Sequence, residues 1–149
     1  MTTELRTILL AEDDPRDAEL TLEALAEYNT GGEIVLVSDG AEALDYLYQR
    51  GKYEGRRAGR PAVALLDIKM PKVTGLEVLR AIKADPHLRP MPVVMLTSSR
   101  EERDLVDGYN LGANAYVVKP VQFMGFLEAV KKLGAFWADV NEPPPNRNQ

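Results

Sequence analysis

Five polar residues follow short apolar runs of the sequence. They are three acids, one hydroxyl and one amine, at Glu12, Asp13, Asp67, Thr97 and Lys119. Carboxylates that lie close together repel one another, so without a cation at least one of them would take up a proton. Carboxylate oxygens are the ligands that Mg²⁺ prefers, and Mg²⁺ commonly shares its site with a phosphate group. These residue types therefore predict a magnesium site at which a phosphoryl group is bound.

Asp67 is the candidate nucleophile of this site, because a carboxylate that attacks a phosphoryl group forms an acyl phosphate. Phosphoryl transfer depends mainly on positioning and on neutralising the charge of the phosphoryl oxygens, which Lys119 and the Thr97 hydroxyl could do together with Mg²⁺. Each residue also has an ordinary reading: an acid at a strand end often caps a helix, as we expect for Asp14. The whole set is hard to explain as structure alone, because clustered acids cost stability unless something binds them.

The apolar pattern predicts five strands alternating with five helices. The strands are expected at residues 7–11, 33–38, 62–66, 92–96 and 115–118, and the last two helices at about 100–111 and 122–137. Elements that alternate in this way form a doubly wound parallel sheet, with strand order 2-1-3-4-5 or the dinucleotide-binding order. The turn at residues 12–15 is acidic and lacks glycine, so it would repel a pyrophosphate. With order 2-1-3-4-5, the ends of the first and third strands are neighbours at the edge where ligands bind.

The composition indicates a globular protein of 149 residues with a net charge of −5 and no cysteine. The acidic balance argues against nucleic-acid binding, and the lack of cysteine excludes disulfides and thiolate chemistry. No apolar run is long enough to span a membrane, and no leader-like segment precedes the first strand, so we expect a soluble, cytoplasmic protein. The single histidine, His87, is expected at the surface, so a phosphoryl donor would be another protein.

Four motifs of the chain resemble those of a known family: L-L-A-E-D-D, L-L-D-I-K-M-P, V-M-L-T-S-S and Y-V-V-K-P. With them, residues 7–137 resemble the receiver domain of two-component response regulators, which has a flavodoxin-like α/β fold. The resemblance implies that Asp67 accepts a phosphoryl group from a sensor histidine kinase and that Lys119 contacts this group. It also implies that Thr97 and Tyr116 form a switch and that the Lys119–Pro120 peptide bond is cis.

The resemblance also implies which groups hold Mg²⁺. They are the carboxylates of Glu12, Asp13 and Asp67 and the backbone carbonyl of Lys69. The acidic pair is Glu-Asp where the family usually has Asp-Asp, so we expect Asp13 to bind the metal directly and Glu12 to act through water. Lys69 stands where many receivers carry asparagine, and a cation there could change the lifetime of the phosphoryl group in either direction.

Loop segments such as R-G-K-Y-E-G-R-R and the ending L-G-A-F-W resemble small stand-alone regulators that partner bacterial and cyanobacterial phytochrome histidine kinases. We therefore expect a receiver domain at residues 1–138 and a disordered tail at 139–149, with signalling by protein contact and no output domain. Phe136 lies off the apolar stripe of the last helix, beside Trp137. These two interface candidates predict a homodimer through the fourth helix, the fifth strand and the fifth helix.

Two other functions use similar residue types. Phosphohydrolases of the haloacid dehalogenase type also form an aspartyl phosphate, but they carry a second acid two residues after the nucleophile, where this chain has Lys69. Their nucleophile also usually follows the first strand. A degenerate receiver would bind partners without being phosphorylated. The basic stretch at residues 50–60 is expected to be a solvated loop, with kinase docking as its functional alternative and nucleic-acid binding as a distant third. The leading prediction is a signalling switch and not an enzyme.

Overall fold

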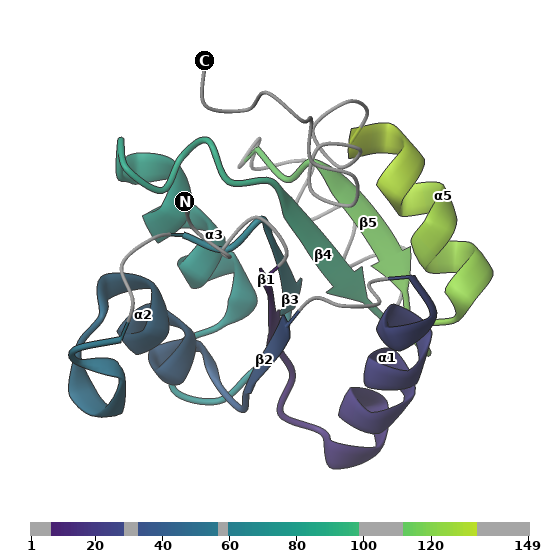
Figure 1. The fold of residues 1–149 in the computed structure, drawn as a ribbon, viewed down its shortest axis with the longest axis horizontal. Helices are drawn as coiled ribbons and strands as arrows, with labels where there is room; N and C mark the ends of the chain where they lie inside the picture. Colours follow the sequence, from purple (N-terminus) through teal and green to yellow (C-terminus); the bar gives the residue numbers. More distant parts are fainter. Residues whose placement is uncertain (1–6, 29–32, 57–59, 99–111, 134–149) are drawn as a thin grey trace.

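The computed structural model describes residues 7–28, 33–56, 60–98 and 112–133. Five parallel strands make a single sheet in the order β2-β1-β3-β4-β5, with helices on both of its faces (Figure 1). The elements are β1 (Thr7–Ala11), α1 (Pro15–Tyr28), β2 (Glu33–Val37), α2 (Gly40–Tyr48), η2 (Gly51–Tyr53), β3 (Val63–Asp67), α3 (Gly75–Ala84), β4 (Val93–Thr97), β5 (Ala115–Val118) and α5 (Phe123–Leu133). The predicted doubly wound, flavodoxin-like fold with strand order 2-1-3-4-5 is confirmed.

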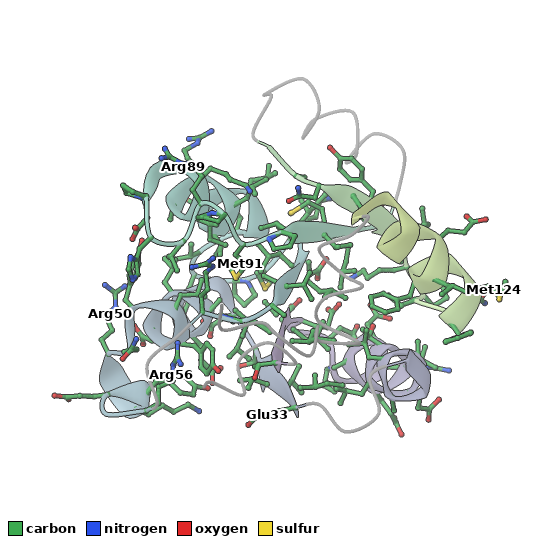
Figure 2. The ribbon with its side chains drawn as sticks, turned by 45° about the horizontal axis from the view of Figure 1, so that its top comes forward. Glu33, Arg50, Arg56, Arg89, Met91 and Met124 are labelled. Carbon is green, nitrogen blue, oxygen red and sulfur yellow. The ribbon has the colours of Figure 1, made fainter. Side chains whose placement is uncertain are left out.

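The central strands of the sheet are buried on both faces, as their continuous apolar sequences predict. Every residue of β1, β3 and β4 is buried. Helices α1 and α5 cover one face, where Leu25 and Phe126 pack in one core cluster. Helices α2 and α3 cover the other face, where Leu47 and Leu79 pack in a second cluster. Met91, labelled in Figure 2, belongs to this second cluster and is fully buried.

The bounds of β2, β3 and β4 differ by one residue from the sequence prediction: β2 ends one residue earlier, and β3 and β4 begin and end one residue later. The prediction places Asp67 and Thr97 directly after their strands, whereas they are the last residues of β3 and β4. The sheet continues to them because Asp67 pairs with Leu96 in the register, and because the Thr97 carbonyl accepts a hydrogen bond from the Lys119 N–H at 2.8 Å. The backbones of both residues are therefore fixed by the sheet itself.

Some predictions concern residues outside the described ranges. They are the helix at 100–111, the continuation of the last helix beyond Leu133, the interface candidates Phe136 and Trp137, and the tail at 139–149. The division into a receiver domain and a tail at residue 138 therefore stays a prediction. Among the described helices, α1 is the longest with 14 residues, and none is long and apolar enough to cross a membrane.

The described part of the basic segment after α2 is anchored to that helix. The guanidinium of Arg56, which Figure 2 labels, lies 3.9 Å from the centre of the Tyr46 ring, and its Nε donates to the Tyr46 carbonyl at 2.9 Å. The Tyr53 hydroxyl donates to the Glu42 carboxylate at 2.6 Å, and Lys52 pairs with the same carboxylate at 2.9 Å. Burial raises the pKa of Glu42, but the hydrogen bonds that it accepts, above all from Tyr53, lower this pKa to about 2. The expectation of a simple solvated loop therefore missed these contacts.

Two glycines let the loops at the carboxyl edge of the sheet pack backbone against backbone. A Cβ atom at Gly75 would lie 2.0 Å from the Asp67 carbonyl oxygen, and a Cβ atom at Gly40 would lie 1.9 Å from the Val73 carbonyl oxygen. The Gly75 N–H donates to the Ile68 carbonyl at 2.8 Å and closes the turn after β3. The start of α3 is thus held directly against the end of the strand that carries Asp67.

Replacing Gly75 with alanine should destabilise the fold, because the added methyl group would overlap the Asp67 backbone. We expect the free energy of unfolding, measured in urea, to fall by about 1–3 kcal/mol. Gly125→Ala is the matched control, because nothing beyond its chain neighbours and the backbone of α5 itself lies within 4 Å of the added methyl group. Alanine also has the higher helix propensity, so the control should be as stable as the wild type or more stable. Wild-type stability of Gly75→Ala would contradict the close packing.

Candidate functional site

The carboxyl ends of β1, β3, β4 and β5 meet at one edge of the sheet and carry the predicted site residues. We refer to this set as the site cluster: Glu12, Asp13, Asp67, Thr97 and Lys119. The Lys119 Nζ atom, directly after β5, lies 3.1 Å from Asp67 Oδ1 at the end of β3. It also lies 3.4 Å from Glu12 Oε1, directly after β1. The structure therefore brings together side chains that are up to 107 positions apart in the sequence. The peptide bond between Lys119 and Pro120 is cis, as the resemblance implies.

Three carboxylates of the site cluster are arranged so that they could hold a metal ion. One oxygen each from Glu12, Asp13 and Asp67 lies within 4.8 Å of the other two. Glu12 and Asp67 are buried, whereas Asp13 is exposed. A group of oxygen ligands with one member at the surface suits a hard divalent cation that keeps part of its water shell.

The electrostatics of the site cluster show an excess of negative charge. Burial and the charge of Asp67 raise the pKa of Glu12 to about 7. Burial also raises the pKa of Asp67, although the neighbouring Lys119 ammonium opposes this shift. Burial alone would lower the pKa of Lys119, but the charges of Asp67 and Glu12 outweigh it and raise this pKa above its ordinary value. A second cation at this position would relieve the repulsion that one ammonium leaves uncompensated.

Thr97 places a buried hydroxyl at the same edge of the sheet. Its side chain is fully buried, and Thr97 Oγ1 has no hydrogen-bond partner among the described residues. Thr21 on α1 is the other described residue whose buried hydroxyl has no such partner. An unpaired buried hydroxyl costs about 1–3 kcal/mol. The Thr97 hydroxyl is therefore free to bond a group that binds at the end of β3, the neighbouring strand.

The remaining predicted residues, Tyr116, Lys69 and His87, differ in their burial. Tyr116 lies opposite Met95 in the β4–β5 register, is half-buried, and packs against the core cluster under α2 and α3. Lys69, two residues after Asp67, has an exposed side chain, and His87 is exposed as expected. The switch role of Tyr116 and the metal-binding role of the Lys69 carbonyl stay predictions.

One acid that touches the site was missed in the sequence analysis. Asp17 Oδ2, in the first turn of α1, lies 3.2 Å from Lys119 Nζ. The predicted helix cap at Asp14 is confirmed, because Asp14 Oδ1 accepts hydrogen bonds from the backbone N–H groups of Arg16 and Asp17. A cap at Asp14 fixes where α1 begins, directly after the acidic pair. Because α1 begins so close to the acidic pair, the sequence could have predicted that an acid in its first turn lies near the site.

Comparison with known proteins agrees with the geometry of the site. The sequence profile of the response regulator receiver domain matches residues 8–131. The chain belongs to this family. Among solved structures, the bacteriophytochrome response regulator RtBRR is 57% identical, covers 93% of this chain and 84% of its own, and superimposes with a TM-score of 0.85. The bacteriophytochrome response regulator AtBRR is 60% identical, with 89% and 94% coverage and a TM-score of 0.84.

A cyanobacterial relative is also similar over most of its length. The response regulator Rcp1 of Synechocystis sp. is 37% identical over 134 residues, which are 90% of each chain. A structure of Rcp1 is described as its Mn(2+)-bound form, with 36% identity, 93% and 96% coverage and a TM-score of 0.71. This receiver is therefore related to phytochrome response regulators, and phosphorylation of an aspartate is the general mechanism of receivers.

Glu12→Gln should increase the stability of the metal-free protein at about pH 8 by on the order of 2 kcal/mol. The pKa of Glu12 is raised in the fold, so its carboxyl favours folding while it is protonated, below the ordinary value of 4.5. This contribution is lost as the pH rises through about 7. The Glu12→Gln variant has no carboxyl at this position, so its stability does not fall in this way. Urea unfolding in the presence of a chelator, at about pH 4 and about pH 8, measures the difference. A variant that is less stable than the wild type at the higher pH would contradict the raised pKa of Glu12 and its cause in burial and in the charge of Asp67.

Proposed function

We propose that this protein accepts a phosphoryl group on Asp67 from a sensor histidine kinase, in the presence of Mg²⁺, and signals by contact with other proteins. The observation that carries the proposal is the 3.1 Å contact between Lys119 Nζ and Asp67 Oδ1 at the end of a buried strand. An ammonium in this position can meet a phosphoryl group as it joins the carboxylate. The similarity to bacteriophytochrome response regulators and Rcp1 favours a phytochrome-type kinase as the donor.

The transfer step uses few protein groups. The Asp67 carboxylate attacks phosphorus, and a P–O bond forms while the P–N bond to the kinase histidine breaks. The electron pair of that bond stays on the imidazole nitrogen. Lys119 neutralises charge on a phosphoryl oxygen, and the unpaired Thr97 hydroxyl donates to another. In the later hydrolysis, water attacks phosphorus and the electron pair of the P–O bond returns to Asp67.

The carboxylates of the site cluster fit a divalent cation. Their oxygens lie within 4.8 Å of one another, and burial together with mutual repulsion raises the pKa of Glu12 to about 7. The Mn(2+)-bound form of the related Rcp1 supports the binding of a divalent ion by this chain. Asp13, Asp67 and the Lys69 carbonyl would hold Mg²⁺, with Glu12 acting through water. When bound, Mg²⁺ neutralises the charge shared by the carboxylates and the phosphoryl oxygens.

The signal would leave the site through Thr97 and Tyr116. A Thr97 hydroxyl drawn toward the phosphoryl group leaves space that the half-buried Tyr116 ring can fill. This movement would alter the surface of β5 and α5, the described part of the predicted interface. We propose that the same surface, with Phe136 and Trp137, forms a homodimer, and that the protein acts in the cytoplasm.

Acetyl phosphate with Mg²⁺ should convert the wild-type protein to an acid-stable, base-labile adduct that Asp67→Asn does not form. Intact mass spectrometry after rapid quenching measures the added phosphoryl group and its persistence. An adduct that lasts for minutes supports a switch. Rapid turnover of phosphoesters would favour a phosphohydrolase, and no adduct on the wild type would leave a degenerate receiver.

Thr97→Val and Thr21→Val should both stabilise the unphosphorylated protein by about 1 kcal/mol, because each replaces an unpaired buried hydroxyl with a methyl group of similar shape. Only Thr97→Val should slow phosphorylation by acetyl phosphate, by about tenfold or more, because it removes a donor to the phosphoryl oxygens. Thr21→Val controls for the change in stability. Equal rates for the two variants would contradict a role for Thr97.

A further inference from the structure

The Lys119 ammonium is surrounded by carboxylates from three different parts of the fold. Its Nζ atom lies 3.1 Å from Asp67 Oδ1, 3.2 Å from Asp17 Oδ2 and 3.4 Å from Glu12 Oε1. Only 14% of its side chain is exposed. An ammonium has three N–H donors, so these carboxylates can occupy all of them. A phosphoryl group on Asp67 therefore gains a donor from Lys119 only if one of these three contacts is given up.

Asp17 differs from the other two carboxylates in its position. Glu12 and Asp67 belong to the group of acids that could hold a metal ion, together with Asp13, whereas Asp17 does not. A cation bound by Glu12 and Asp67 would neutralise part of their negative charge. The contact between Asp17 and Lys119 would remain. Asp17 sits in the first turn of α1, where its backbone N–H is bonded to Asp14 Oδ1 at 3.2 Å, so the helix start fixes its backbone.

We propose that Asp17 is a positioning residue that holds Lys119 toward α1 and thereby limits how fast Asp67 is phosphorylated. This inference rests on the proposed function. Asp17 competes with the incoming phosphoryl group for the ammonium, and its own negative charge repels that group. The Asp17 side chain is 28% exposed, so salt screens both effects.

Asp17→Asn tests the proposal, because the amide keeps the size of the side chain and removes its charge. The measurement is the apparent second-order rate constant of phosphorylation by acetyl phosphate with Mg²⁺, from quenched intact mass spectrometry. We expect this constant to rise about twofold to fivefold, the range of a single partly exposed ion pair. The gain should shrink in about 1 M salt. Asp17→Glu, which restores the carboxylate, should return the rate toward that of the wild type.

The matched control is Glu19→Gln, which removes one negative charge from an exposed position on the same helix. Its rate should equal the wild-type rate. The ¹⁵N chemical shift of Lys119 Nζ gives an independent readout, which should change in Asp17→Asn and not in Glu19→Gln. An unchanged or lower rate for Asp17→Asn, or an equal gain for Glu19→Gln, would overturn the role of Asp17 alone. A wild-type chain that takes up no phosphoryl group would overturn the proposed function as well.

Discussion

The repulsion between carboxylates that meet at the carboxyl edge of the sheet is the constraint on which the site depends. Glu12 and Asp67 are both buried there, and Lys119 lies within 3.4 Å of each. One ammonium balances only part of this charge, and burial together with the charge of Asp67 keeps the pKa of Glu12 raised to about 7. The packing of the fold maintains this charge arrangement. Binding of a further cation at the site would stabilise the folded protein.

The sheet creates this constraint because it fixes the backbone of the acids. The order β2-β1-β3-β4-β5 makes β1 and β3 neighbours, so the backbones of Glu12 and Asp67, directly after the paired residues Ala11 and Leu66, are held side by side. Gly75 adds to this by placing the start of α3 against the Asp67 carbonyl oxygen. Packing energy spread over a buried sheet therefore maintains a local charge arrangement that would be unfavourable by itself.

The sequence predicted the strands and the site cluster well, because each buried strand is a continuous apolar run that ends at a polar residue. The prediction placed Asp67 and Thr97 one residue after their strands, whereas they are the last strand residues. Backbone hydrogen bonds between strands can form with any residue type, so the sequence does not show where they stop. The Asp17–Lys119 contact depends on how α1 is rotated against β5, which is a tertiary property. The anchoring of Arg56 on Tyr46 was also missed, because a polar, glycine-rich stretch is typical of a loop and the contact joins a cation to a ring.

The contacts that hold the basic segment on α2 have a consequence for how this protein could diversify. Glu42, Tyr46, Lys52, Tyr53 and Arg56 bind one another within a short stretch of chain. The contacts of Glu42 with Tyr53 and Lys52, and those of Arg56 with Tyr46, lie within this segment and α2. The exposed surface of this segment can therefore change in sequence while the arrangement at the sheet edge is kept, so these two parts of the molecule are free to evolve separately.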